Sequence, residues 1–425
     1  MSHHRGSIEK KQAPYSEAAG TGQYAKRTGL AGKYDNVRRF WEDEVTRLFL
    51  RSYLKDIVDA KARRLERLRV LDLGCGVGDG YDLLTGVTAK EPGLYEYAVE
   101  LMDKKMLGLY KGIDINLDLI AEASEYYGGD ERIAFEAGDF SAGLRLGRDA
   151  PYDVYFTSYG TVSHFTTEQT VRLLADIARH AAPGALVVLD WLGRYSYEWQ
   201  DLWTEAGGDD YFMDYRISYI YPPEERSEVE IQSFPLRLLS RADALAVVEE
   251  AGRLSGVTLE VERFFDRSIF VGRHMDTAEY NRHCPAVRQA VNSLLEPNTR
   301  TDLTALLMDY HPRNGFPALN AYFEKFFLAW NALVVHVIEF LSAFGGEGGK
   351  GAAASPDLYK FYPEPLRRAV STMERVVETT GDLPGDARAN IIEPQLAYAL
   401  RRLEMELQSG EGTGHGFAGV ITVRK

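Results

Sequence analysis

Short apolar segments alternate with amphipathic ones through the first two thirds of the chain, and this pattern predicts alternating β-strands and α-helices. The first strand is predicted at 70–73, and it leads directly into glycines at positions 74, 76, 78 and 80. Glycine lets the backbone turn tightly and lets a ligand approach the main chain. A strand, a glycine turn and a helix, in this order, build a nucleotide site at the end of the first strand of an α/β sheet.

Four more strands are predicted at 108–115, 132–137, 152–156 and 185–189. Strands that alternate with helices form a mostly parallel sheet with helices on both faces. The gap between the first two strands is longer than one helix needs, so residues 91–105 are expected to add a helix of their own. Two later strands are expected at 257–264 and 268–271, where they form a hairpin with each other. A last strand is expected at 417–423 and returns to the main sheet.

Polar residues suited to capping mark the starts of three helices. Asp35 is a suitable N-cap for a long helix whose apolar residues follow at helical spacing. Thr166 with Gln169, and Ser240 with Asp243, are spaced to cap two later helices.

The chain beyond residue 280 has the pattern of a helical region. Apolar faces recur at helical spacing at 286–295, 303–308, 318–344, 366–377 and 396–407. A glycine- and alanine-rich stretch at 345–355 is typical of a mobile loop. Residues 326–344 are strongly apolar, but Asn331, His336 and Glu339 interrupt them. Since a membrane span needs ~20 residues with few or no charges, we expect a buried core helix.

The segment 195–235 follows the fifth strand and is rich in aromatic residues: Tyr195, Tyr197, Trp199, Trp203, Tyr211, Phe212, Tyr215, Tyr219 and Tyr221. Two interpretations remain open. These residues form the core of an inserted subdomain, or they form the wall of a substrate pocket, because ligands bind at the carboxyl ends of such strands. The two interpretations are compatible.

The net charge and the number of cysteines limit the kinds of binding partner and the cellular location that are expected. The 425 residues carry a formal net charge of −14, which argues against a nucleic-acid partner because such proteins need a basic face. The basic stretch 61–69 is interrupted by acids and is interpreted as a solvated helix face. Two cysteines make no disulfide framework, so a reducing, cytoplasmic location fits. Residues 1–12 lack the apolar core of a secretory signal and are expected to be disordered.

The glycine turn fails two phosphate-binding patterns. The dinucleotide fingerprint G-x-G-x-x-G would require a glycine at Asp79 or Tyr81. A P-loop is absent as well, because Gly349-Lys350 is not followed by Ser or Thr. The glycine turn therefore fits a ligand that is held by the main chain and by acidic side chains better than it fits a dinucleotide or a nucleoside triphosphate.

The ordered set of motifs resembles the class I S-adenosylmethionine-dependent methyltransferases. The motifs are VLDLGCGVG at 70–78, GIDI at 112–115, GDF at 138–140, the run 152–160 and PGALV at 183–187. They cover about residues 35–273. The resemblance implies a Rossmann-like, mostly parallel seven-stranded sheet flanked by helices, and S-adenosyl-L-methionine as the cofactor. The C-terminal α-helical region has no recognised counterpart.

The resemblance also implies which residues hold this cofactor. The methionine end would lie against Asp72, Gly74, Gly76, Gly78 and, from the fourth strand, Ser158 and Tyr159. Asp114 would take both ribose hydroxyls, since a carboxylate can accept two hydrogen bonds. Asp139 and Phe140 would contact adenine. Cys75 and Ile115 belong to the same set.

The resemblance implies a methyltransferase that acts by in-line displacement. The acidic net charge and the aromatic segment favour a small-molecule acceptor with a reacting oxygen or nitrogen, and a protein substrate stays open. A base is needed only if the acceptor must lose a proton, and His164 is the best candidate because an imidazole titrates near ~6.5. Its alternative role is to brace the next helix. Tyr195 is a second candidate catalytic residue. His336 and Glu339 lack the further ligands of a metal site, so no metal is expected.

The expected organisation is a lead-in at 1–34, a methyltransferase domain at 35–279, a helical region at 280–410 and a last strand within 411–425. The helical region caps the pocket or mediates a homodimer. No membrane partner is expected. Two other functions stay open: a cofactor-binding interaction protein without methyl transfer, and a nicotinamide-dependent oxidoreductase.

Overall fold

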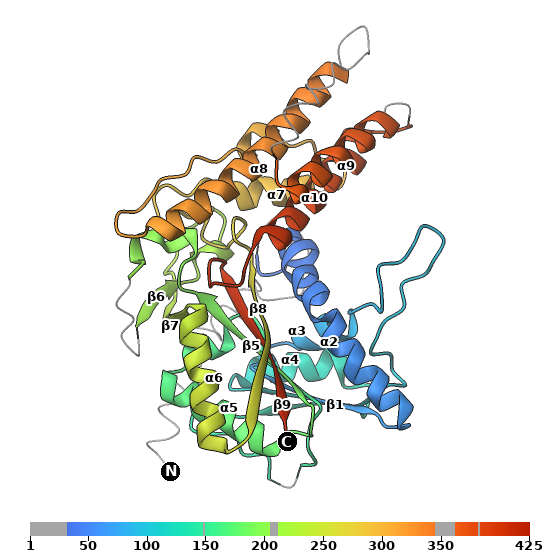
Figure 1. Ribbon diagram of the computed structural model, residues 1–425, viewed down its shortest axis with the longest axis vertical. Helices are drawn as coiled ribbons and strands as arrows, with labels where there is room; N and C mark the ends of the chain where they lie inside the picture. The colour runs from blue at the N-terminus through green and yellow to red at the C-terminus, as the bar shows by residue number, and fades with distance from the viewer. Residues whose placement is uncertain (1–31, 148, 205–210, 345–361, 381–382) are drawn as a thin grey trace.

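The computed structural model describes residues 32–425, apart from 148, 205–210, 345–361 and 381–382 (Figure 1). The expectations for residues 1–12 and 345–355 therefore lie outside the described residues. Five parallel strands form the centre of the sheet in the order β3-β2-β1-β4-β5. They are β1 (Leu68–Leu73), β2 (Leu107–Asp114), β3 (Ile133–Ala137), β4 (Val154–Phe156) and β5 (Leu186–Gly193).

The strand order reverses beside β1. This strand pairs with β2 on one side and with β4 on the other. Ligands of open α/β sheets bind at such a switch point, outside the carboxyl ends of the strands. The glycine turn that follows β1 therefore lies where a ligand site is expected.

The last strand, β9 (Gly416–Arg424), lies inside the sheet. It runs antiparallel between β5 and β8 (Thr258–Arg267), which gives the order β3-β2-β1-β4-β5-β9-β8. The predicted Rossmann-like, mostly parallel sheet is thus confirmed. A further antiparallel pair, β6 (Phe212–Arg216) and β7 (Ser233–Leu239), continues from the end of β5.

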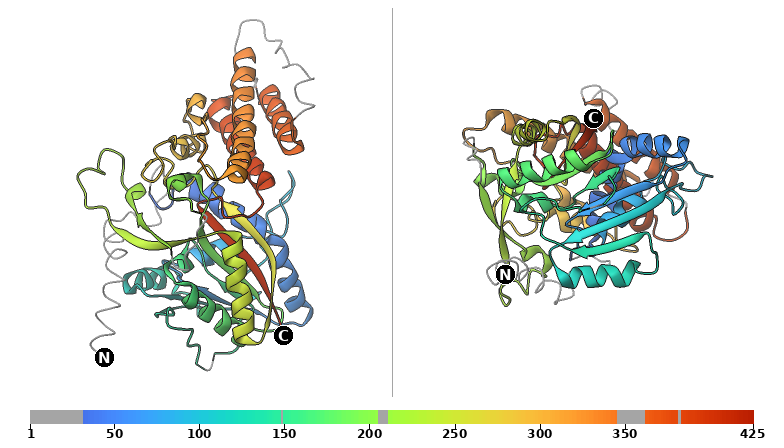
Figure 2. Two further views of the ribbon diagram at one scale, coloured as in Figure 1. Left: turned by 60° about the vertical axis from the view of Figure 1, so that its left-hand side comes forward. Right: turned by 90° about the horizontal axis from the view of Figure 1, so that it is seen from below.

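Each face of the sheet carries a hydrophobic core, because successive strand residues point to opposite faces. In β1, Val70 belongs to one core and Leu71 to the other. α5 (Thr167–His180) and α6 (Arg241–Ser255) cover the face of Leu71. α2 (Asp43–Arg63) and α3 (Asp79–Thr85) cover the face of Val70, and their core continues into the C-terminal helices (Figure 2).

The predicted helix starts are confirmed. Asp35 Oδ1 accepts a hydrogen bond from the Arg38 N–H at 2.8 Å. The helices α5 and α6 begin with complete capping boxes at Thr166 and Ser240. Between Asp35 and α2 the chain makes a π-helical turn, η1 (Arg38–Glu42). This geometry is rare and recurs at functional sites.

The C-terminal helices stand beyond one end of the sheet (Figures 1 and 2). They are α7 (Val287–Leu294), α8 (Pro317–Phe344), α9 (Glu364–Thr380) and α10 (Glu393–Leu407). α8 is long and apolar enough to cross a membrane, but half of its apolar window is buried inside the protein. Its Trp330 is fully buried, with its ring 6.1 Å from that of Trp41. One face of α8 therefore belongs to the core, as expected.

Three predicted elements are wrong. Residues 91–105 form a loop without a helix: Tyr95 and Tyr97 are 93% and 94% exposed, and only Leu101 and Met102 near its end are buried in the core. Residues 268–271 are not a strand, since Ser268 adopts a left-handed φ of 58°. Residues 303–308 contain only the short 3-10 turn η5 (Leu303–Leu306).

Glu404 of α10 is fully buried and makes stability depend on pH. Its carboxylate accepts hydrogen bonds from the N–H groups of Ile269 (2.9 Å) and Phe270 (3.3 Å), and burial raises its pKa to about 7. A carboxyl group with a raised pKa holds its proton more tightly in the folded state. Its stabilising contribution is therefore present at low pH and is lost as the pH rises towards 7.

We expect the free energy of unfolding to fall by about 2 kcal/mol more between pH 5 and pH 8 in the wild type than in Glu404→Gln. The amide retains an acceptor for the two N–H groups and has no proton to lose in this range. Urea unfolding at a series of pH values measures the difference. Equal pH dependence in the two proteins would contradict the assignment.

Candidate functional site

A cavity of about 510 Å³ lies at the carboxyl ends of β1, β2, β3 and β4. Ten residues singled out in the sequence line it: Gly74, Cys75, Gly76, Asp114, Ile115, Asp139, Phe140, Ser158, Tyr159 and His164. They follow four different strands. The sheet therefore brings together motifs that are far apart in the sequence.

The loop after β1 presents bare backbone to this cavity. Gly74 and Gly76 have left-handed φ values of 73° and 53°, a region that favours glycine. A Cβ on Gly76 would meet nothing nearer than Lys33 Nζ, at 3.9 Å, so the space beside its main chain is open. The Gly74 N–H donates to the Ile113 carbonyl at 2.7 Å, which fixes the loop against β2. The loop forms a cradle that a larger residue would fill.

Carboxylates lie at the ends of β2 and β3. Asp114 accepts hydrogen bonds from the N–H groups of Gly76 (2.9 Å) and Asn116 (2.9 Å), so it joins the glycine loop to the start of α4 (Leu117–Tyr127). Burial raises its pKa, and these hydrogen bonds offset part of the rise. A carboxylate has about four acceptor positions, so Asp114 can also accept from ligand hydroxyls. Asp139 accepts from the Ser141 N–H at 2.9 Å.

Tyr159 lies between two arginines at the end of β4. The guanidinium carbons of Arg38 and Arg267 are 3.1 Å and 4.2 Å from the centre of its ring. Its hydroxyl donates to Asp43, and Arg267 pairs with Asp190 at 2.7 Å. These contacts join the loop after β4 to η1, α2, β5 and β8 around one side of the cavity.

Two predicted cofactor residues do not line the cavity. Asp72 is fully buried in β1, where it accepts a hydrogen bond from the Tyr110 hydroxyl at 2.5 Å and burial raises its pKa to about 7. Gly78 precedes α3 and faces the ring of Tyr127, which a Cβ would approach to 2.6 Å. Both residues shape the turn from within the protein, so their effect on a ligand is indirect.

The aromatic segment after β5 contributes to the core and to the cavity. Trp203 stacks on Phe323 of α8, with ring centres 5.5 Å apart. Tyr215 and Tyr219 line the cavity. Tyr195, predicted to be catalytic, does not line it, because its ring packs edge-on against Trp203 at 6.3 Å.

Five rings that line the cavity lie close to one another, and we call them the aromatic wall: His164, Phe234, Tyr215, Tyr219 and His415. His164 ends the 3-10 turn η2 (Thr161–His164), and its ring lies 5.6 Å from Phe234 of β7. Phe234 stacks on Tyr215 at 6.1 Å, and Tyr215 meets His415 at 6.0 Å.

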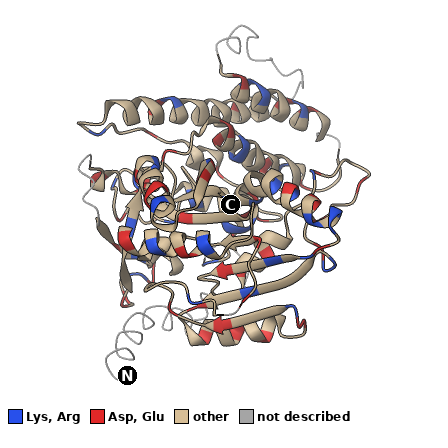
Figure 3. Cartoon of the chain, turned by 60° about the horizontal axis from the view of Figure 1, so that its bottom comes forward, with Lys and Arg blue, Asp and Glu red and all other residues tan. Residues whose placement is uncertain are grey.

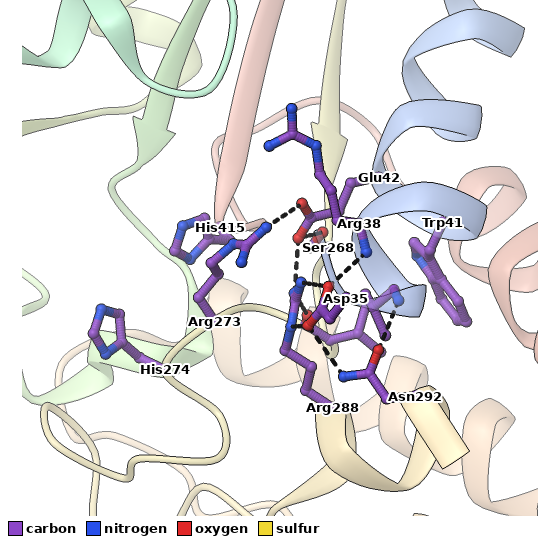
Figure 4. A network of polar contacts seen from close by, with 12 residues as sticks. Asp35, Arg38, Trp41, Glu42, Ser268, Arg273, His274, Arg288, Asn292 and His415 are labelled. Atoms are coloured by element: carbon purple, nitrogen blue, oxygen red, sulfur yellow. Dashed lines mark hydrogen bonds and ion pairs between the residues drawn. The ribbon is translucent and has the colours of Figure 1, made fainter. Parts of the chain in front are cut away.

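A buried ion network joins the cavity to the helical region (Figure 4). Arg288 of α7 donates to both oxygens of Asp35 at 2.8 Å and to Glu42 at 2.7 Å. Glu42 also pairs with Arg273 at 3.2 Å, and both of these residues line the cavity. Burial raises the pKa of Glu42, but the arginines beside it, Arg288 foremost, hold it well below its usual value.

Charged residues of both signs are interspersed along the helices and strands in the view of Figure 3. In the basic stretch at the end of α2, Lys61 pairs with Asp153 at 2.8 Å and with Glu66 at 3.0 Å. This stretch is therefore a partly neutralised surface, as the sequence indicated.

Reactive cysteines and metal ligands are not found where the structure describes the chain. Cys75 and Cys284 are buried thiols. Burial raises the pKa of the Cys75 thiol, so it is protonated at neutral pH and is a poor nucleophile. Within the described residues, no group of three or more His, Cys, Asp or Glu side chains could hold a metal ion.

Sequence reasoning missed several charged or titratable residues of the cavity, among them Arg267, Arg273 and His415. The arginines carry no local motif. His415 had a signal, since glycines at 412, 414 and 416 surround it. A Cβ on Gly414 would lie 2.6 Å from the Arg267 carbonyl oxygen, so this loop approaches β8 more closely than a larger residue allows.

Comparison with known proteins gives distant structural matches. No protein-family model and no curated protein matches the chain. Streptomyces venezuelae DesVI is 17% identical, with 50% of this chain and 86% of that chain covered and a TM-score of 0.29. CalS10 from Micromonospora echinaspora, an amino pentose methyltransferase, is 16% identical, with 59% and 91% covered and a TM-score of 0.31. A methyltransferase from Methanosarcina mazei is 15% identical, with 48% and 84% covered and a TM-score of 0.33.

The architecture of the chain itself is more informative. Its sheet has the order β3-β2-β1-β4-β5-β9-β8, with β9 antiparallel. Its cavity lies at the switch point beside β1, where the sequence motifs meet. The chain thus has a mostly parallel, Rossmann-like α/β fold with a cavity at the switch point of its sheet.

Proposed function

We propose that the protein transfers a methyl group from S-adenosyl-L-methionine to an oxygen or nitrogen atom of a small-molecule acceptor. The observation that carries this proposal is the continuity of the cavity, which extends from the glycine loop to the aromatic wall. One end offers backbone and carboxylates, and the other end offers aromatic rings. A donor and an acceptor can therefore meet in one enclosed space.

The donor end has the features that this cofactor needs. Gly74, Cys75, Gly76, Ser158 and Tyr159 line this end of the cavity, and the open space beside the Gly76 main chain would receive the methionine end. Asp114 would accept hydrogen bonds from both ribose hydroxyls. Asp139 and Phe140 would hold the adenine. When bound, the cofactor supplies an electrophilic methyl group on a sulfonium centre.

The acceptor end favours a small molecule with an aromatic or apolar part. Tyr215, Tyr219 and Phe234 offer ring faces, and Arg273 and Arg267 lie beside them, paired with Glu42 and Asp190. Methyl transfer needs the acceptor, the methyl group and the sulfur in line. Holding reactants in such a geometry supplies on the order of 7–11 kcal/mol. The side chains of this end would mainly position the acceptor.

Incubation with isotopically labelled S-adenosylmethionine and a metabolite extract, followed by mass spectrometry, tests the proposal. We expect a labelled small-molecule product and thermal stabilisation by S-adenosylhomocysteine. Binding without any labelled product would favour a cofactor-binding interaction protein. Stabilisation by NADH but not by S-adenosylmethionine would favour an oxidoreductase and contradict the proposal.

His164→Ala is expected to lower turnover about 10-fold or more and to leave cofactor affinity unchanged, because His164 lines the acceptor side of the cavity and would help to position the acceptor. Initial rates with labelled donor and calorimetry with S-adenosylhomocysteine measure the two effects. Full activity in this variant would assign His164 a purely structural role.

A further inference from the structure

At one end of the aromatic wall, a carboxylate, an imidazole and a phenol form a chain of polar contacts. They belong to Glu198, His415 and Tyr215. The two carboxylate oxygens of Glu198 are 2.9 Å and 3.1 Å from His415 Nδ1. His415 Nε2 is 3.3 Å from the Tyr215 hydroxyl. Glu198 is fully buried, whereas His415 and Tyr215 line the cavity. None of the three residues belongs to the proposed donor site.

Neighbouring groups hold the Glu198 carboxylate in one orientation. Ser196 Oγ donates to it at 3.2 Å, and the His274 N–H donates to its other oxygen. A Cβ on Gly272 would come within 1.9 Å of Glu198 Oε1. The absence of a side chain at Gly272 therefore leaves room for the carboxylate, and the two donors orient it towards His415.

The backbone of the loop before β9, which carries His415, is fixed by several hydrogen bonds. The buried Asp266 carboxylate accepts hydrogen bonds from the N–H groups of Glu411 (3.0 Å), Thr413 (2.7 Å) and Gly414 (3.1 Å). The His415 N–H donates to the Ser268 carbonyl at 3.1 Å. A side chain on a backbone fixed at this many points keeps its geometry when a ligand arrives.

This arrangement determines which imidazole nitrogen can take a proton. A carboxylate only accepts hydrogen bonds, so the hydrogen between Glu198 and His415 belongs to Nδ1. The lone pair of the neutral ring is then on Nε2, which faces the Tyr215 hydroxyl inside the cavity. A buried carboxylate that selects the tautomer and stabilises the imidazolium makes histidine an effective general base.

We propose that His415 is the general base of the methyl transfer, that Glu198 is its positioning residue, and that the acceptor carries an O–H or N–H group. The inference rests on the proposed function. His415 Nε2 takes the proton of the acceptor as the acceptor atom bonds to the methyl carbon and displaces the sulfur, which keeps the electron pair of the broken carbon–sulfur bond. The imidazolium then passes its proton to water.

Nitrogen-15 NMR of histidine-labelled protein tests the positioning step without any acceptor. We expect the His415 signals, identified by their loss in His415→Gln, to report the Nδ1–H tautomer. In Glu198→Gln the amide can donate to Nδ1, so the preference for this tautomer should disappear. The same tautomer in the wild type and in Glu198→Gln would overturn the role of Glu198.

Transfer from labelled S-adenosylmethionine into the metabolite extract tests the base. His415→Gln should lower the rate about 10²- to 10⁴-fold, and Glu198→Gln at least about 10-fold. Both variants should bind S-adenosylhomocysteine as the wild type does, which also establishes that they fold. His180→Gln is the matched control, because His180 Nδ1 likewise meets a tyrosine hydroxyl, that of Tyr155 at 2.6 Å, but outside the cavity.

The two failures are distinguishable. A wild-type rate in His415→Gln would overturn this inference and leave the proposed function intact. An absence of transfer by the wild type itself would overturn the proposed function. A loss of rate in His180→Gln as large as that in His415→Gln would also overturn the inference, since the effect would not depend on the cavity.

Discussion

Replacing Asp114 by alanine is expected to weaken the binding of S-adenosylmethionine about 100-fold or more while the fold remains intact. The carboxylate ends β2 at the cavity, and in the proposed complex it accepts both ribose hydroxyls. Hydrogen bonds to a charged group contribute about 1.5–3 kcal/mol each, and about 1.4 kcal/mol corresponds to a tenfold change in affinity. Calorimetric titration with S-adenosylhomocysteine measures the loss.

Two further variants make this test specific. Asp118→Ala removes an exposed carboxylate from the first turn of α4 and should leave the dissociation constant unchanged. Asp114→Asn keeps an acceptor for the Gly76 N–H and should weaken binding less than alanine does. An unchanged dissociation constant in Asp114→Ala would remove the ribose assignment.

Replacing Arg288 by methionine is expected to lower the free energy of unfolding by about 3–5 kcal/mol. Arg288 is 3% exposed and holds Asp35 and Glu42 through three hydrogen bonds of 2.7–2.8 Å. Methionine fills much of the same volume but leaves two buried carboxylates without this partner. Breaking a buried ion pair from one side is costly because the remaining charge is no longer compensated. Urea unfolding followed by tryptophan fluorescence measures the change.

A surface arginine provides the control. Arg300 is exposed and pairs with Asp386 at 2.8 Å, so Arg300→Met should change stability little. Equal effects of the two substitutions would contradict a special role for the buried network.

The network also has a definite pH dependence. Because the pKa of Glu42 is depressed in the folded state, its stabilising contribution is present above the unfolded value of about 4.5 and is lost as the pH falls. Arg288→Met should therefore reduce the loss of stability on acidification.

The grouping of the proposed donor-end residues around one cavity was predictable because each of these residues lies in a local sequence motif. The glycines at 74 and 76 follow a strand directly, and Asp114 and Asp139 end or follow the next two strands. Parallel strands bring their carboxyl ends to one edge of the sheet, so a correct assignment of strands places these residues together.

The acceptor end depends on contacts between distant segments. His415 reaches the cavity only because β9 enters the sheet beside β5, and Glu198 meets it from the turn after β5. Neither contact has a local pattern. Tertiary structure also overrode local propensity at 268–271, where the N–H groups of Ile269 and Phe270 donate to the buried Glu404 and not to a neighbouring strand.

The interior position of β9 has a consequence for how the protein is made. The two strands that flank β9, β5 and β8, are synthesised before the C-terminal helices α7, α8, α9 and α10. β9 is synthesised after these helices. The sheet is therefore completed only when this strand inserts, and until then the facing edges of β5 and β8 have unpaired backbone groups. Open strand edges are sites of aggregation during synthesis. Fragments that end before His415 would retain this open edge permanently, along with a site that lacks this histidine.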